Sequence, residues 1–116
     1  MKKVTCLFFM TEAGRVPVKD FVEATDLRSQ RKFFYVVELL EHFGMQLDLP
    51  HARYIGDDIF ELRFESVEGA VRVLYFFFHR ETAILTNAFV KKTDKTPFRE
   101  KEVALERRKV YLERHR

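Results

Sequence analysis

Five basic side chains in the second half of the chain have the types and the spacing to act together on a phosphate group. They lie in or just after segments rich in β-formers, and they are Arg63, Arg72, Lys91, Lys92 and Lys95. Two guanidinium groups can bind a phosphate through paired, planar hydrogen bonds. Closely spaced cations also lower the pKa of a nearby lysine, because one positive charge disfavours another. Any of the three lysines can then serve as the acid or the base in a proton transfer.

The hairpin register predicted from the sequence brings these cations to one face of a sheet. Three strand-like segments follow one another closely, namely Ile59–Glu65, Ala70–His79 and Thr82–Lys91. A first turn of even length pairs Arg63 with Arg72, and a two-residue turn at Arg80-Glu81 pairs Arg72 with Phe89. Lys91 then lies on the same face, because side chains alternate along a strand. Opposed like charges destabilise a sheet, so folding alone gives little reason for the arginine pair.

A purely structural interpretation competes with this one. Glu61 and Glu65 lie two positions either side of Arg63 and, on an ordinary solvated face, would neutralise it. The convergence of the lysines on the same place favours a functional cluster over that interpretation.

The histidines and the single cysteine give no sign of a metal site or a nucleophile. No two histidines have metal-ligand spacing, so neither a metal nor a cofactor is expected. His42 and His115 are expected at the surface and His79 at a strand end, while His51 lies in a loop from which it could approach the cations. Cys6 has apolar neighbours and reads as a buried structural thiol.

The first half of the chain predicts one strand and two helices. Lys3–Met10 is rich in β-formers, and Pro17 opens a short helix to about Ala24. Asp26 caps a longer helix that ends at Gly44, and its core-facing stripe recurs at helical spacing. Leu47–Tyr54, around Pro50, is interpreted as a connecting segment. The apolar stripe consists of Phe33, Val36, Val37, Leu40 and Phe43.

After the three strands, Thr96 is expected to cap a last helix that Pro97 opens and that runs to about Glu113. The order β-α-α-β-β-β-α predicts an α+β fold, with a small twisted antiparallel sheet packed on two N-terminal helices, plus a C-terminal helix. The whole chain, 1–116, is expected to form a single domain. The sheet face expected to pack on the helices carries Phe60, Leu62, Phe64, Val71, Val73, Tyr75 and Phe77.

Charge is distributed unevenly along the 116 residues. Residues 1–90 hold 11 basic and 13 acidic side chains, whereas residues 91–116 hold 10 basic and 5 acidic ones. This basic C-terminal quarter favours a polyanion as a partner, although a solvated helix face is an equal alternative. No apolar run approaches the roughly 20 residues that span a bilayer, and no leader peptide is recognisable, so a cytoplasmic protein is expected.

Three motifs in order give the sequence a family resemblance. They are Phe60-Glu61-Leu62-Arg63, Val71-Arg72-Val73-Leu74-Tyr75, and the segment from Phe89 through Lys91, Lys92 and Lys95 to Pro97. Pro17-Val18-x-x-Phe21 and Leu39-Leu40-x-x-x-Gly44 extend the match to the helices. The chain resembles the phage-derived HigB-like branch of the RelE/ParE toxin superfamily. Val71 stands where an aromatic residue often precedes the arginine, a mild departure.

The resemblance implies a toxin of a bacterial type II toxin–antitoxin pair, neutralised by a helix-turn-helix antitoxin. It implies a metal-free mRNA endonuclease acting on translating ribosomes. In such a reaction the five cations would be the catalytic set, with no cofactor. Phe89 would stack on an unpaired base, and the last helix would meet RNA through basic residues. The expected RNA-binding residues are thus Phe89, Arg99, Lys101, Arg107 and Arg108.

Three alternatives remain open at this stage. A toxin similar to the ParE members would inhibit DNA gyrase by binding and would not need the cationic cluster. A non-catalytic nucleic-acid-binding protein would bind RNA or DNA in a salt-dependent manner and leave it uncut. A decayed relic would fold without activity.

Overall fold

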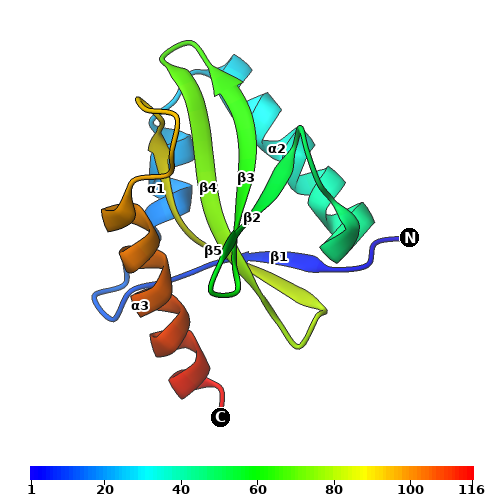
Figure 1. Cartoon of the computed structure of the whole chain (residues 1–116), viewed down its shortest axis with the longest axis vertical. Helices are drawn as coiled ribbons and strands as arrows, with labels where there is room; N and C mark the ends of the chain where they lie inside the picture. Colours follow the sequence, from blue (N-terminus) through cyan, green and yellow to red (C-terminus); the bar gives the residue numbers. More distant parts are fainter.

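The computed structural model describes residues 1–116 and has the α+β class that the sequence predicts (Figure 1). A short 3₁₀ turn, Gly44–Gln46, follows the second helix. The helices and strands in chain order are β1 (Thr5–Phe8), α1 (Pro17–Glu23), α2 (Leu27–Phe43), β2 (Ala52–Gly56), β3 (Ile59–Ser66), β4 (Gly69–Phe78), β5 (Thr82–Val90) and α3 (Phe98–Arg114).

The sheet differs from the predicted one in two respects. It has five strands in the order β1-β5-β4-β3-β2, and β1 pairs with β5 in parallel, so the sheet is mixed rather than purely antiparallel. A parallel partner is open to β1 because the chain passes through both N-terminal helices before it returns to the sheet. The second difference is β2, which occupies part of the segment interpreted as a connection and pairs with β3.

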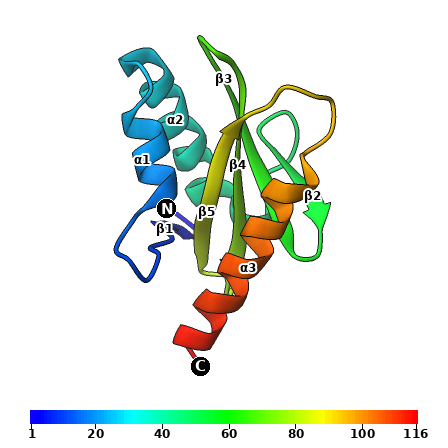
Figure 2. The same ribbon diagram turned by 90° about the vertical axis from the view of Figure 1, so that its left-hand side faces the viewer.

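Helices cover both faces of the sheet. Figure 2 shows α1 and α2 on one side and α3 on the other. The predicted apolar face is confirmed, since Leu62, Phe64, Val71, Val73 and Tyr75 join the core formed with α1 and α2. Phe60 and Phe77 pack at its margin. None of the helices combines the length and the apolar character that crossing a bilayer requires.

A second, smaller core lies beneath α3. Ala104 of α3 is fully buried and belongs to the same cluster as Leu74, Phe76, Ile84 and Phe89 from β4 and β5. This helix begins at Phe98, with Pro97 at its N-cap and no side-chain cap hydrogen bond. The expected capping role of Thr96 is therefore wrong, because its hydroxyl is engaged elsewhere.

The register that aligns the cations is confirmed. Arg63 lies opposite Arg72 across β3 and β4, and Arg72 lies opposite Phe89 across β4 and β5. The pairing of Arg72 with Phe89 is as predicted, although the two-residue turn from which it was predicted is wrong. The turn leaves three residues between Phe78 and Thr82 rather than two, and a bulge between Leu74 and Tyr75 of β4 takes up Thr86 as the extra residue of β5. The two departures cancel before the chain reaches Phe89.

Candidate functional site

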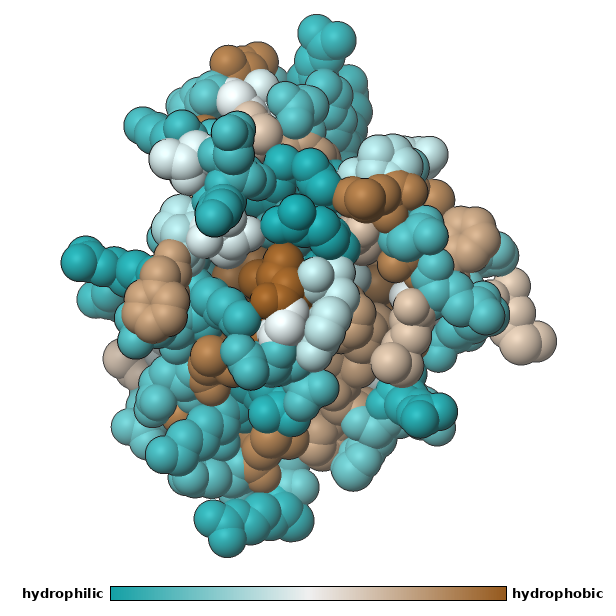
Figure 3. Space-filling model, in the orientation of Figure 1, coloured by the Kyte–Doolittle hydropathy of each residue, from teal (hydrophilic) through white to brown (hydrophobic).

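Four of the five predicted cations line one open hollow at the end of the sheet. We call this hollow, of about 440 Å³, the cationic groove; Ala70, Thr93 and Asp94 complete its lining. The cations are Arg63 from β3, Arg72 from β4, and Lys91 and Lys92 from the segment directly after β5. In Figure 3, hydrophilic side chains gather over the upper part of β3 and β4, where this end of the sheet lies. Lys95 lies on the following loop, is exposed, and does not line the groove.

The four cations differ in their exposure to solvent. Arg72 is only 6% exposed, Arg63 and Lys91 are half-buried, and Lys92 is exposed. The Arg72 guanidinium donates a hydrogen bond from Nη1 to the backbone oxygen of Val71, 3.0 Å away. The backbone N–H of Lys91 donates to the oxygen of Ala70 at 2.7 Å. The sheet thus fixes where Lys91 leaves β5.

A buried carboxylate lies against the inner side of this cluster. Glu61 of β3 is 0% exposed, and its Oε1 lies 3.6 Å from Arg72 Nε and 3.5 Å from Arg53 Nε. Thr96 Oγ1 donates a hydrogen bond of 2.6 Å to Glu61 Oε2. Glu61 forms its ion pairs with Arg72 and Arg53, rather than neutralising Arg63 as the structural interpretation supposed.

Burial and mutual repulsion lower the pKa values of two cations of the groove, Lys91 and Arg72. The pKa of Lys91 is lowered, first by desolvation and then by the nearby Arg72 charge, with Glu61 acting in the opposite direction. Burial and Arg63 likewise lower the pKa of Arg72, again against the effect of Glu61. Lys91 therefore offers more neutral amine at a given pH than a free lysine does. The groove can bind an anion and has a lysine suited to proton transfer.

The structure engages Phe89 and most of the predicted RNA-binding residues of the last helix in contacts within the protein. Phe89 is 8% exposed and packs in the second core, so its ring is not an open surface for a base. Lys101 Nζ pairs with Asp57 Oδ2 at 2.9 Å, and Arg108 Nη2 lies 3.4 Å from Asp58 Oδ2. Both acidic residues form the β2–β3 turn and have positive φ.

Arg107 also has a partner within the protein, whereas Arg99 is exposed to solvent. Arg107 Nη1 donates to the backbone oxygen of Thr86 at 2.8 Å, which satisfies the carbonyl of the bulge residue. Its guanidinium also lies 5.8 Å from the centre of the Phe9 ring. Arg99, at the start of α3, is exposed. The sequence could not distinguish these cases, because the contacts depend on where α3 docks.

Sequence reasoning considered Glu61 only as a partner of Arg63, and it missed the cluster that Glu61 forms with Arg72, Arg53 and Thr96. A signal for Glu61 existed, because the predicted register places it opposite Leu74 and so diagonal to Arg72. Arg53 lies opposite Glu61 on β2 and was out of reach while β2 was interpreted as a connection. Nothing in the sequence points to the Thr96 hydrogen bond.

The histidines and Cys6 lie outside the groove. His51 is half-buried, and its ring meets Tyr35 edge to face at 6.2 Å. Burial, together with the Glu41 carboxylate, raises the pKa of the Cys6 thiol to about 12, as befits a structural residue. No three His, Cys, Asp or Glu side chains lie close enough together to share a metal ion.

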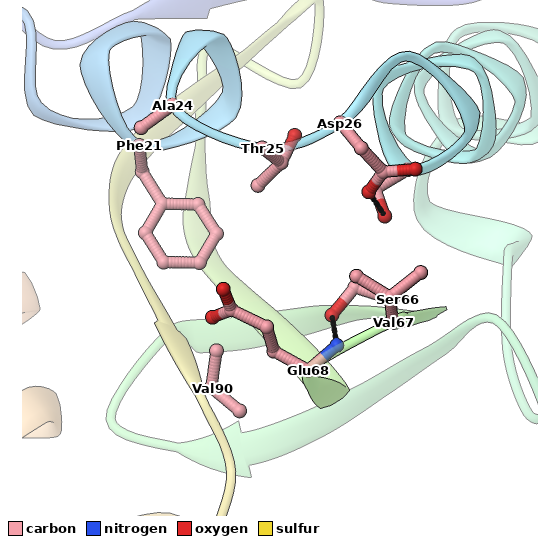
Figure 4. Close-up of a pocket in the computed structure, with 9 residues that line it drawn as sticks. Phe21, Ala24, Thr25, Asp26, Ser66, Val67, Glu68 and Val90 are labelled. Atoms are coloured by element: carbon pink, nitrogen blue, oxygen red, sulfur yellow. Dashed lines mark hydrogen bonds between the residues drawn. The ribbon is translucent and has the colours of Figure 1, made fainter.

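A second hollow lies on the other side of the same sheet end, beside the junction of α1 and α2. We call this cavity, of about 340 Å³, the helix-side hollow. Figure 4 shows the Phe21 ring, the Val90 side chain and the Glu68 carboxylate directed into it. It has no cation, and its other lining residues are Ala24, Thr25, Asp26, Ser29, Ser66 and Val67. A phosphate would meet only carboxylates and neutral groups there, so this cavity does not share the chemistry of the groove.

Comparison with known proteins gives one family. The sequence matches the family described as phage-derived protein Gp49-like (DUF891) over residues 20–109. No curated protein matches the chain. The matched range contains all the strands that form the groove, all four of its cations and Glu61. Because this match covers most of the chain, the protein belongs to the phage-derived Gp49-like family, a toxin-like family of the RelE/ParE type.

Proposed function

We propose that the protein is the toxin of a bacterial type II toxin–antitoxin pair and that, as in HigB-like toxins, it cuts mRNA on translating ribosomes. The observation that carries the proposal is the cationic groove, in which Arg63, Arg72, Lys91 and Lys92 converge from three segments. Membership of a toxin-like family supports the toxin part of the proposal. Neither protein binding nor folding calls for two arginines opposed across a ladder.

The proposed reaction is attack by an RNA 2′-hydroxyl on the neighbouring phosphodiester. The 2′-oxygen loses its proton and bonds to phosphorus, the bond from phosphorus to the 5′-oxygen breaks, and the 5′-oxygen gains a proton. The products are a 2′,3′-cyclic phosphate end and a 5′-hydroxyl end. Arg63 and Arg72 would stabilise the negative charge that grows on the phosphate, and Lys91 would take part in the proton transfer.

The lowered pKa of Lys91 supports its assigned role, because a proton-transfer group works best when its pKa approaches the working pH. Lys92, in the lining, would contact the phosphate, and Lys95 and Arg99 would extend that contact beyond the groove. The metal-free route is supported by the charge of the lining, since four cations would repel a divalent ion as they attract a phosphate.

The proposed partners are mRNA, the ribosome and a cognate helix-turn-helix antitoxin, all in the bacterial cytoplasm. Antitoxin binding would be seen as reversal of growth arrest on co-expression. The adjacent reading frame is the first place to look for that protein.

The test is 5′-end mapping of RNA in a reconstituted bacterial translation system. Wild-type protein is expected to create new 5′-hydroxyl ends inside translated frames, only when ribosomes are present. Arg63→Ala should reduce their rate of appearance about 10²–10³-fold, as loss of one charge-stabilising donor does. Arg80→Ala is the matched control, because it removes an exposed arginine that does not line the groove.

Two other outcomes would overturn the endonuclease. If folded wild-type protein makes no new ends yet arrests growth, the toxin acts by binding, and inhibition of DNA gyrase is the next assay. If it binds RNA in a salt-dependent manner and leaves it uncut, it is a non-catalytic nucleic-acid-binding protein.

A further inference from the structure

Glu61 is the point at which the strands of the groove and the loop after β5 meet. Its Oε1 is shared by Arg53 of β2 and Arg72 of β4, at 3.5 and 3.6 Å. Its Oε2 accepts the Thr96 hydroxyl hydrogen bond of 2.6 Å. One fully buried carboxylate is therefore in contact with both neighbouring strands and with the segment that leads into α3.

The two ion pairs are coulombic rather than hydrogen-bonded. Neither Glu61 Oε1 nor Arg72 Nε has a hydrogen-bond partner, although both atoms are buried. A buried charge without a counter-charge is strongly destabilising. Arg72 also faces Arg63 directly, which adds repulsion. The Glu61 charge thus offsets part of the cost of holding the charged Arg72 guanidinium at 6% exposure beneath the groove.

The Thr96 hydrogen bond has a separate consequence for the loop. Residues 91–95 run between two attachments, the Lys91 N–H on the Ala70 oxygen at 2.7 Å and the Thr96 hydroxyl on Glu61. Lys92 and Lys95 lie between them and are exposed. A loop fixed at both ends samples fewer conformations than one fixed at a single end.

We propose that Glu61 and Thr96 are positioning residues of the cationic groove: Glu61 holds Arg72 in place by charge, and Thr96 ties the lysine-bearing loop to that carboxylate. The arrangement of the groove follows from the geometry. Its effect on RNA cleavage rests on the proposed function.

The first experiment observes the groove without any RNA. Glu61→Gln keeps the shape of the side chain and removes its charge, whereas Thr96→Val keeps the shape and removes the hydroxyl. Glu65→Gln is the matched control, because Glu65 is on the same strand and face but exposed, and it forms no ion pair. NMR of the arginine Nε–H groups, the Lys91 titration and loop amide exchange are measured in all four proteins.

In Glu61→Gln the Arg72 Nε–H resonance should shift and broaden, because its counter-charge is gone. The pKa of Lys91 should fall further below its ordinary value, since Glu61 raises it in the native protein while Arg72, Arg53 and Arg63 lower it. Thr96→Val should leave the Arg72 resonance nearly unchanged and speed amide exchange in residues 92–95. Glu65→Gln should produce only small changes.

An unchanged Arg72 resonance and Lys91 titration in folded Glu61→Gln would overturn the proposal for Glu61. Where that variant does not fold, Thr96→Val decides, and unchanged loop exchange in it would overturn the role of Thr96. Cleavage kinetics form a separate arm, in which Glu61→Gln should lower kcat on the order of 10²-fold with little change in KM, as misplacement of a reacting group does. If the NMR changes occur while wild-type protein cuts no RNA, positioning stands and the endonuclease fails.

Discussion

The cationic groove and the helix-side hollow lie back to back at one end of the sheet, yet they offer opposite chemistry. The groove has four cations and one carboxylate in its lining, whereas the helix-side hollow has no cation and includes Asp26 and Glu68. Val90 lines the hollow and Lys91, the next residue, lines the groove. The alternation of side chains thus separates an apolar wall from a cationic wall.

What covers each side completes the difference. The Val90 side faces α1 and α2, whose packing requires apolar side chains there. On the other side, α3 packs on Leu74, Phe76 and Ile84, further along the strands, and leaves the end of the sheet open. The openness of the groove therefore depends on where α3 stops covering the sheet, and its charge depends on the residues themselves.

The largest effect should come from comparing Lys91 with Val90, two consecutive residues that line opposite faces of the sheet. Lys91→Met is expected to lower the rate of RNA cleavage about 10²–10³-fold, because it removes a proton-transfer group and a charge from the groove. Val90→Ala, which alters only the helix-side hollow, should leave cleavage nearly unchanged. Both rates are measured in the translation system after circular dichroism confirms folding. An equal loss in both variants would mean that the two sides do not differ in function.

An intermediate effect is expected on stability, where a substitution in the helix-side hollow should matter more than one in the groove. Phe21→Ala should reduce the free energy of unfolding by about 2 kcal/mol, less than for a fully buried phenylalanine, because Phe21 is half-buried against the core. Lys92→Ala should change it by less than about 0.5 kcal/mol, as an exposed substitution does. Urea unfolding measures both values. Stability lost chiefly through Lys92 would refute the division between a structural and a functional side.

The smallest effect concerns salt. Binding of an uncleavable 2′-O-methyl RNA single strand should weaken as salt rises, and Lys92→Ala should reduce the slope of log K against log salt by about 0.7. Glu68→Gln, on the helix side, should leave the slope unchanged. Fluorescence anisotropy over a range of KCl concentrations gives both slopes. A slope that changes in Glu68→Gln and not in Lys92→Ala would mean that the RNA binds at the helix-side hollow and not in the cationic groove.

Local patterns sufficed to predict the parts of the site that depend on strand register. Arg63 faces Arg72 because the turn between β3 and β4 has even length, as the prediction assumed. The apolar face of the same strands follows from alternation and is confirmed. For Arg72 and Phe89 the right pairing was reached with a turn one residue too short, since the bulge at Thr86 was not predicted.

Contacts between distant segments could not be predicted in this way. Phe89 shares a face with Arg72, and its burial follows only from the docking of α3. Lys101 and Arg108 look like free cations in the sequence, but they pair with the β2–β3 turn, which depends on a strand that was not predicted. Glu61 was recognised as a neighbour of Arg63, whereas its partners lie on β2, β4 and the loop before α3.

Because of the bulge at Thr86, the extra residue in the β4–β5 turn does not change the strand register at the groove. One surplus residue enters at the turn and is absorbed within β5, and the Arg107 hydrogen bond satisfies the carbonyl of that residue. The tip of this hairpin, with His79 and Arg80 exposed, is therefore the natural place to graft a short epitope or a reporter peptide. Homologous chains should also vary in length there more freely than between β3 and β4, where no such bulge buffers the register of the two arginines.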